Sequence, residues 1–131
     1  MVKKILIVDD DQPIINLLSG LSAKFFKQTE IVVAQSKEEA LAVINSNKDI
    51  DIVIVQFGVT SLFSKQTVRA AGLEIVSQVK QLSAAKIIVM TSAGNMKKDF
   101  LAIGADYFIN NNFDSKKISA VFSLLNQQPA P

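Results

Sequence analysis

Apolar residues along the chain fall into two alternating patterns, short continuous runs and longer segments with a helical period. The continuous runs predict five strands, at residues 5–8, 31–34, 52–55, 87–90 and 107–109, of which the last is the weakest. A strand that is covered on both faces of a parallel sheet is apolar at consecutive positions, whereas a strand with one face in water alternates. The runs therefore indicate a parallel sheet that is buried on both sides.

Between the runs, apolar residues recur at spacings of three or four. They predict five helices, at residues of about 12–27, 37–46, 73–82, 95–103 and 115–126. The first helix is expected to bury one stripe, which consists of Ile14, Leu17, Leu18, Leu21 and Phe25. The fourth helix has Phe100, Leu101 and Ile103 as its apolar residues. Ser36 and Glu39 fit a capping box at the start of the second helix, and Gly104 is expected to follow the end of the fourth.

A strand followed by a helix, repeated five times, predicts an α/β fold with one parallel sheet between helices. We expect a doubly wound (βα)5 domain of flavodoxin-like topology, with strand order 2-1-3-4-5. The domain is expected to span residues 1–126, and residues 127–131 are typical of a linker-like tail. Ligands of such folds bind at the carboxyl ends of the strands, so functional residues are expected at this edge.

Composition excludes most enzyme chemistry. The chain of 131 residues has no cysteine and no histidine, which excludes thiol nucleophiles, thiolate and imidazole metal sites and the commonest general base. The net charge of +2 gives no case for nucleic acid as a partner. No apolar stretch is long enough for a membrane span or a secretion signal. We therefore expect a cytoplasmic protein that binds no nucleic acid and no membrane and is not an enzyme.

Candidate site residues follow four of the five predicted strands. Asp9, Asp10 and Asp11 follow the first, Gln56 the third, Thr91 and Ser92 the fourth, and Asn110, Asn111 and Asn112 the fifth. Consecutive carboxylates at a strand end are typical of Mg²⁺ sites, since this ion binds one or two carboxylates together with water and phosphate oxygens. We expect no required cofactor, and a Mg²⁺ site at Asp9 and Asp10 that is weak or lost. The alternative is that one acid caps the next helix and the others face water.

These landmarks, in this order, resemble the receiver domain of bacterial response regulators, a CheY-like family, over nearly the whole chain. The resemblance rests on KILIVDDD (4–11), DIVIVQ (51–56), GLEI (72–75), IIVMTSA (87–93) and GADYFINNNF (104–113). It implies a metal-binding role for Asp9 and Asp10 and a phosphoryl-binding hydroxyl role for Thr91. In the family, an aspartate at the end of the third strand accepts the phosphoryl group, and a lysine after the fifth strand pairs with it.

The chain departs from the family at both of those positions. Gln56 stands at the acceptor position and Asn111 at the lysine position. An uncharged amide has no nucleophilic carboxylate oxygen, so Gln56 cannot form an aspartyl phosphate. The switch position on the fifth strand holds Phe108, which lacks the hydroxyl of the usual tyrosine. The resemblance therefore implies an atypical receiver domain, or pseudo-receiver, that lacks the phospho-acceptor aspartate.

The connection between Gln56 and Gly72 exceeds the usual length of about 2–6 residues for a βα loop. Its fifteen residues, 57–71, show little periodicity and include Lys65 and the only arginine, Arg69. These two cations either fold over the acids after the first strand or are simply solvated. The apolar residues of the loop either pack onto the domain or form a partner surface.

The expected function is that of a protein-interaction module of two-component (phosphorelay) signal transduction that works without phosphorylation. The resemblance implies that the face formed by the fourth helix, fifth strand and fifth helix binds a protein partner, with a homodimer as an alternative. Lysines at 97, 98, 116 and 117 are candidates for this face. Two other interpretations stay open. One is a response regulator phosphorylated on Asp9 or Asp10 with Mg²⁺, and the other is a degenerate receiver segment of a larger hybrid kinase or regulator.

Overall fold

The computed structural model describes residues 2–57, 65–91, 96–110 and 115–126, and within these the side chains of all residues except 57 and 65–71. Strands and helices alternate five times, as predicted. The elements are β1 (Lys4–Val8), α1 (Gln12–Phe25), β2 (Glu30–Ala34), α2 (Lys37–Ser46), β3 (Ile52–Phe57), α3 (Lys65–Leu82), β4 (Lys86–Thr91), α4 (Lys97–Ala102), β5 (Tyr107–Ile109) and α5 (Ser115–Asn126).

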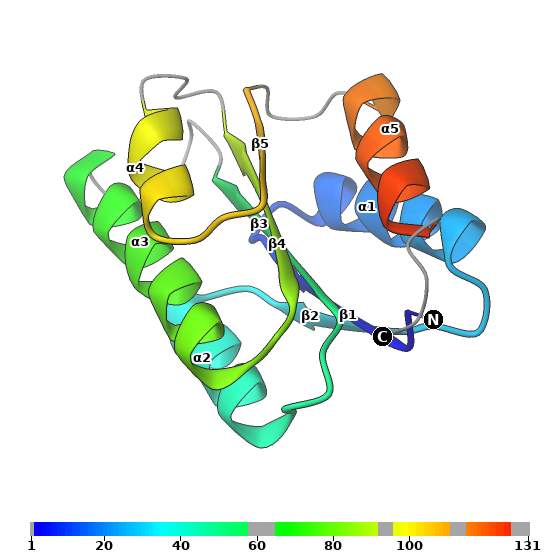
Figure 1. Cartoon of the computed structure of the whole chain (residues 1–131), viewed down its shortest axis with the longest axis horizontal. Coiled ribbons are helices and arrows are strands. Elements are labelled where there is room, and N and C mark those ends of the chain that lie inside the picture. The colour runs from blue at the N-terminus through cyan, green and yellow to red at the C-terminus, as the bar shows by residue number, and fades with distance from the viewer. Residues whose placement is uncertain (1, 58–64, 92–95, 111–114, 127–131) are drawn as a thin grey trace.

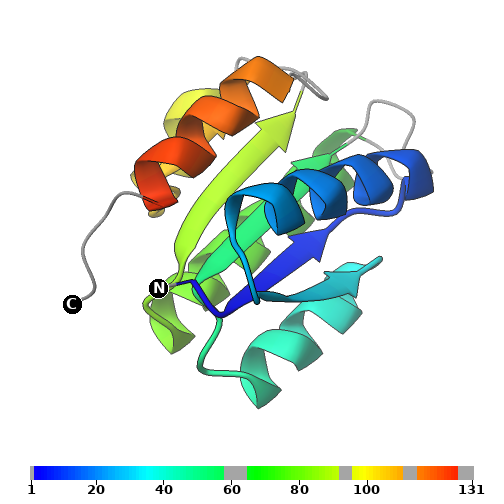
Figure 2. The same cartoon turned by 90° about the vertical axis from the view of Figure 1, so that its right-hand side faces the viewer.

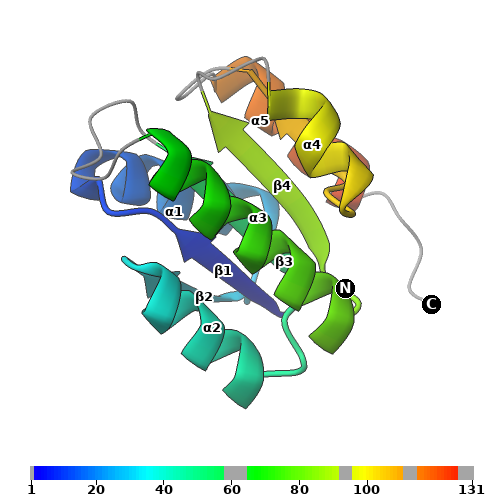
Figure 3. The ribbon, with the colours of Figure 1, turned by 90° about the vertical axis from the view of Figure 1, so that its left-hand side faces the viewer.

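The five strands form one parallel sheet in the order β2-β1-β3-β4-β5, which confirms the predicted doubly wound, flavodoxin-like topology. Figure 1 shows α1 and α5 on one side of the sheet and α2, α3 and α4 on the other. Figure 2 faces the side with α1 and α5, and Figure 3 faces the side with α2, α3 and α4. Helices on both faces explain why the strands are continuous apolar runs.

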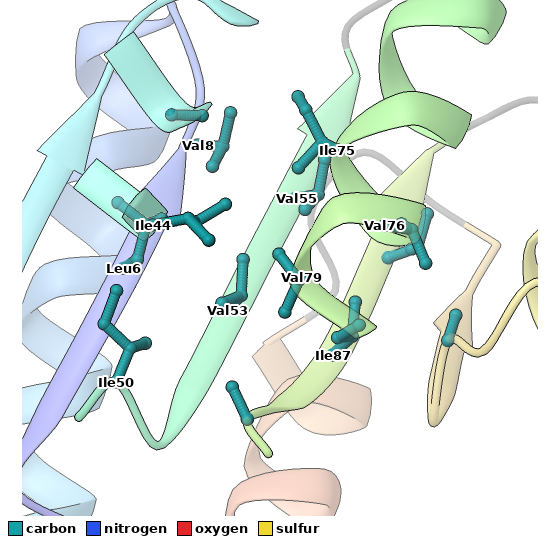
Figure 4. Packing of buried hydrophobic residues seen from close by; sticks show 14 of the residues in the cluster. Leu6, Val8, Ile44, Ile50, Val53, Val55, Ile75, Val76, Val79 and Ile87 are labelled. Atoms are coloured by element: carbon teal, nitrogen blue, oxygen red, sulfur yellow. The ribbon is translucent and has the colours of Figure 1, made fainter. Parts of the chain in front are cut away.

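Consecutive residues of each strand enter two separate hydrophobic cores, one on each face of the sheet. In β1, Leu6 and Val8 join the core under α2, α3 and α4. Ile5 and Ile7 join the core under α1 and α5. Figure 4 shows the first core, in which side chains of β1, β3 and β4 meet those of α2 and α3. The alternation follows from strand geometry, because successive side chains point to opposite faces.

Helix α3 begins at Lys65 and not at the predicted residue 73. The prediction of one loop over residues 57–71 is therefore wrong for residues 65–71, and Lys65 and Arg69 lie on a helix. It is also wrong for Phe57, which ends β3. Irregular apolar spacing and Gly72 favour a loop, but the lysine, glutamine, arginine and alanine residues of this segment are good helix formers. Gly72 is buried within the helix and does not end it. Local helix propensity decides the structure here.

Leu17 is 50% exposed, so the prediction that it belongs to the buried stripe of α1 is wrong. The buried residues of this helix are Ile15, Leu18 and Ser22, so the face they share packs against the sheet. An α-helix turns by about 100° per residue, which carries Leu17 out of that direction while Leu18 enters the core. Leu101 of α4 is likewise 40% exposed, next to the fully buried Phe100.

The two predicted features at helix ends are confirmed. Ser36 Oγ accepts a hydrogen bond from the backbone N–H of Glu39 at 3.1 Å. The carboxylate of Glu39 in turn accepts a hydrogen bond from the N–H of Gln35. Gly104 follows α4 with a φ of +118°. The bond to Ser36 satisfies an N–H group that the helix start leaves without a partner, and the Glu39 carboxylate binds the N–H of the residue that precedes the N-cap.

Replacing Gly104 with alanine is expected to lower the free energy of unfolding by about 1 to 3 kcal/mol. L-residues rarely adopt the φ of +118°, and a Cβ at this position would lie 2.5 Å from Cγ of Lys80. Gly20→Ala is the matched control, because a Cβ added to Gly20 meets no atom within 4 Å. In the middle of α1 this change is expected to stabilise the protein by up to about 1 kcal/mol. Urea denaturation measures both, and an unchanged stability of Gly104→Ala would contradict the prediction.

Candidate functional site

Three buried polar side chains gather at the carboxyl ends of the three central strands. Asp9 follows β1, Gln56 lies near the end of β3 and Thr91 ends β4; they are 4%, 6% and 3% exposed, respectively. Val8 of β1 pairs with Val55 of β3. Asp9 and Gln56 are the next residues along these two neighbouring strands. Thr91 ends β4 opposite the last residue of β3, which follows Gln56. The structure thus places the acid, amide and hydroxyl residues at one edge of the sheet, as the sequence predicts. Thr91 continues the row of Val89, on the face of the sheet that lies under α2, α3 and α4.

The carboxylate of Asp9 is buried and incompletely hydrogen-bonded. Its Oδ1 accepts a hydrogen bond from the N–H of Asp11 at 3.1 Å, whereas its Oδ2 has no partner among the described residues. Burial raises the pKa of Asp9 to about 6, the hydrogen bond from Asp11 opposes this shift, and the charges of Asp10 and Asp11 add to it. Above that pH the protein therefore holds a buried negative charge that no described cation neutralises.

Gln56 presents a neutral amide on the same face of the sheet as Asp9. Ile7 of β1 and Ile54 of β3 both belong to the core under α1 and α5. Side chains two residues apart on a strand share a face, so Asp9 and Gln56 continue these two neighbouring rows. Gln56 is polar but uncharged, and so it adds no carboxylate to the acids that follow β1.

The resemblance implies a Mg²⁺ ion at this edge, and the residues present fit the ion as a weak site. The Oδ2 atom of Asp9 is an available ligand, and the neighbouring Asp10 is exposed. In the part of the chain that the structure describes, no cluster of three acidic residues is arranged to hold a metal ion. Mg²⁺ dehydrates reluctantly and favours charged oxygen ligands, so two carboxylates and a neutral amide are a poor set.

Several predicted site residues lie outside what the structure describes. Asn111 and Ser92 are not among the described residues. Lys65 and Arg69 lie on α3, but the description does not extend to their side chains. The hypothesis that these two cations fold over the acids after the first strand therefore stays a prediction, as does the role of Asn111.

Phe108, the predicted switch residue, is a partly buried aromatic of β5. It packs against the core under α2, α3 and α4, and the centroid of its ring lies 6.2 Å from that of Phe100, with 32° between the ring planes. This contact joins β5 to α4, because Phe100 is a fully buried residue of that helix. A movement of Phe108 during signalling stays a prediction.

The surface formed by α4, β5 and α5 is basic and partly apolar. Its exposed lysines are Lys97 and Lys98 on α4 and Lys116 and Lys117 on α5. Leu101 adds an exposed apolar side chain. The signal for its exposure is its position directly after Phe100, since adjacent helix residues point about 100° apart. β5 is an edge strand that contacts both helices, which makes this surface continuous.

Residues 5–123 match the family described as the response regulator receiver domain. This chain belongs to that family. The match extends from β1 into α5 and includes Asp9, Gln56 and Thr91. The resemblance inferred from the sequence is thereby confirmed, and the chain is a receiver domain of the kind found in two-component response regulators.

Solved structures of other receiver domains are similar to this one. The signal receiver domain of a DNA-binding response regulator from Colwellia psychrerythraea 34H superposes with a TM-score of 0.76 at 19% identity, over 96% of this chain and 99% of that one. A CheY-like response regulator receiver domain protein from Methanospirillum hungatei JF-1 gives a TM-score of 0.71 at 24% identity, over 96% of this chain and 94% of that one. At these identities the likeness confirms the fold of the receiver domain.

Proposed function

We propose that this receiver domain acts in two-component signal transduction as a pseudo-receiver, a protein-interaction module that works without aspartyl phosphorylation. The observation that carries the proposal is Gln56, a buried amide near the end of β3. The sequence resemblance assigns this position to the family's acceptor aspartate. An aspartyl phosphate forms when a carboxylate oxygen attacks phosphorus, and a neutral amide is not such a nucleophile. The domain accordingly has no reaction of its own, and we propose that it is not an enzyme.

We further propose that the interaction role requires no metal ion. Asp9 and Asp10 are the residues that would hold Mg²⁺, and the ion would neutralise the acids after β1. The raised pKa of Asp9 supports weak binding, because a proton competes with the ion for this carboxylate near neutral pH.

The proposed partner is a protein that docks on the surface formed by α4, β5 and α5. The four exposed lysines of this surface and the exposed Leu101 support a partner with an acidic rim and an apolar centre. The net charge of +2 supports a protein partner over nucleic acid. None of the described helices is long and apolar enough to cross a membrane. A cytoplasmic location is part of this proposal.

Incubation with Mg²⁺ and acetyl phosphate, followed by measurement of the intact mass, tests the proposal. We expect the mass of the chain to stay unchanged, because Gln56 offers no carboxylate to phosphorylate. Gln56→Asp restores a carboxylate at the same place and is expected to gain a phosphoryl adduct. A receiver domain that is readily phosphorylated serves as the positive control for the donor.

A phosphoryl adduct on the unchanged chain would contradict the proposal. It would favour the alternative in which Asp9 or Asp10 accepts the phosphoryl group. In that case the adduct should be labile to hydroxylamine, as acyl phosphates are, and it should be lost in the Asp9→Asn or the Asp10→Asn variant.

A further inference from the structure

The outer face of α1 carries almost no charge. Seven of its residues are exposed, and Lys24 is the only charged residue of the whole helix. The solvent face of a helix in a globular protein is normally rich in charged and polar residues. Of the six uncharged exposed residues, Gln12 and Asn16 are polar and are hydrogen-bonded to each other, and Pro13, Leu17, Gly20 and Ala23 are not polar. Figure 2 shows α1 on the outside of the molecule, and no other described segment lies over its outer face.

Leu17 and Gly20 form a projection and a gap on this face. Leu17 is 50% exposed, and a Cβ added to Gly20 would meet no atom within 4 Å. Residues three positions apart are neighbours on a helix surface, so the projection lies beside the gap. A glycine inside a helix costs roughly 0.5–1 kcal/mol relative to alanine. Neither a positive φ nor a close neighbour within the described chain explains Gly20.

The two ends of α1 carry opposite charges. Asp10 and Asp11 are exposed directly before the helix, and Lys24 lies in its last turn. With a rise of 1.5 Å per residue, Lys24 lies about 8 Å and Asp11 about 11 Å from the midpoint between Leu17 and Gly20, in opposite directions. A second α1 turned end for end about that midpoint brings its Asp11 within reach of Lys24 of the first. The same pair forms again at the other end.

We infer that two copies of this chain associate through α1, with the two helices antiparallel about a two-fold axis. Leu17 of each copy fills the space over Gly20 of the other, and Lys24 of each pairs with Asp11 of the other. A two-fold contact requires a surface that is complementary to itself in shape and charge, and the outer face of α1 meets both conditions. Antiparallel helix dipoles add a small favourable interaction.

This contact is distinct from the surface of α4, β5 and α5 proposed for the protein partner. α1 lies beside α5 and on the side of the sheet opposite to α4 (Figures 1 and 3), so α4 and the edge strand β5 remain accessible in the dimer. One helix per copy makes a small interface, which gives a weak dimer that forms with rising concentration.

Sedimentation equilibrium of the full chain over a concentration series tests this inference. The average mass is expected to rise from that of the monomer towards that of the dimer. Leu17→Lys replaces the apolar projection with a charged side chain, and Gly20→Lys fills the gap with a side chain that has open space in the monomer. Each variant is expected to weaken association by about tenfold or more. Gly20→Lys should unfold at an equal or higher temperature, so its loss of association cannot be due to misfolding.

Leu101→Lys is the matched control. It makes the same substitution at a leucine of similar exposure, on α4, and is expected to leave association unchanged. A loss of association in Leu101→Lys but not in Leu17→Lys would overturn the inference and place the dimer contact on the partner surface. A monomer mass at every concentration up to the solubility limit would overturn it as well.

A charge exchange tests the direction of the two helices. Lys24→Asp is expected to weaken association at low salt, because it places like charges opposite each other. Adding Asp11→Lys to the same chain should restore association, because opposite charges again face each other. The Asp11 side chain makes no hydrogen bond to the start of α1, so this change breaks no helix cap. Failure of the double variant to regain association would overturn the antiparallel arrangement.

Discussion

Asp9→Asn is expected to raise the free energy of unfolding at pH 7 by about 2 to 3 kcal/mol. The carboxylate of Asp9 is buried, one of its oxygens has no hydrogen-bond partner among the described residues, and its pKa is raised from 3.8 to about 6. Ionisation of this group at neutral pH therefore opposes folding. Asparagine has nearly the same shape and no charge, so it removes this cost.

The gain in stability from Asp9→Asn is expected to depend on pH. A carboxyl group with a higher pKa in the folded than in the unfolded protein binds its proton more tightly when folded, so stability falls as the pH rises between the two values. The stability that the protonated carboxyl group of Asp9 gives the folded protein is fully present below pH 3.8 and is lost as the pH rises through about 6. The difference in stability between Asp9→Asn and the unchanged protein should be near zero at the acidic end and largest above pH 6.

Urea denaturation at a series of pH values measures this difference. Asp10→Asn is the matched control, because it removes the same charge from an adjacent, exposed side chain. Its effect on the free energy of unfolding is expected to stay within about 0.5 kcal/mol. A destabilised Asp9→Asn variant at neutral pH would contradict the prediction and would indicate a cation held at Asp9.

Phe122→Ala is expected to lower the free energy of unfolding by about 3 to 5 kcal/mol. Phe122 of α5 is fully buried in the core under α1 and α5. Its ring makes edge-to-face contacts with Phe25 and Phe26, with centroid separations of 5.8 Å and 5.3 Å. Alanine would leave a cavity and would remove both ring contacts, which join α5 to the end of α1.

Leu124→Ala is the control on the same helix, because Leu124 is 55% exposed and fills no core space. It is expected to change the free energy of unfolding by no more than about 0.5 kcal/mol. Since a domain of this size is stable by roughly 5–15 kcal/mol, Phe122→Ala should still show a folded baseline. A loss below about 1 kcal/mol would mean that α5 contributes little to the core.

Much of the fold follows from local patterns in the sequence. The continuous run at β1 is apolar because its alternate residues enter two cores, and a parallel sheet covered on both faces is the arrangement that produces this pattern. The capping residues Ser36 and Glu39 act within one turn of helix, so their roles were predictable from spacing alone.

The start of α3 and the exposure of Leu17 were not predictable in the same way. At residues 65–72 the apolar period is weak, and a glycine there is equally typical of a loop and of a buried helix position. In α1, Ile15 widens the apolar arc beyond the five predicted residues, and the sequence does not say which edge of that arc faces the sheet.

The sequence by itself determined which residues lie at the carboxyl edge and which chemistry they lack. Asp9, Gln56 and Thr91 follow strand runs, and an amide instead of a carboxylate at Gln56 is a property of the chain alone. Only the tertiary structure decided that each of these three side chains is buried, that the Asp9 carboxylate lacks a described counter-ion and that Leu17 and Gly20 face solvent. The physical reason is that periodicity records spacing along one element, whereas burial and charge neutralisation depend on which other elements pack against it.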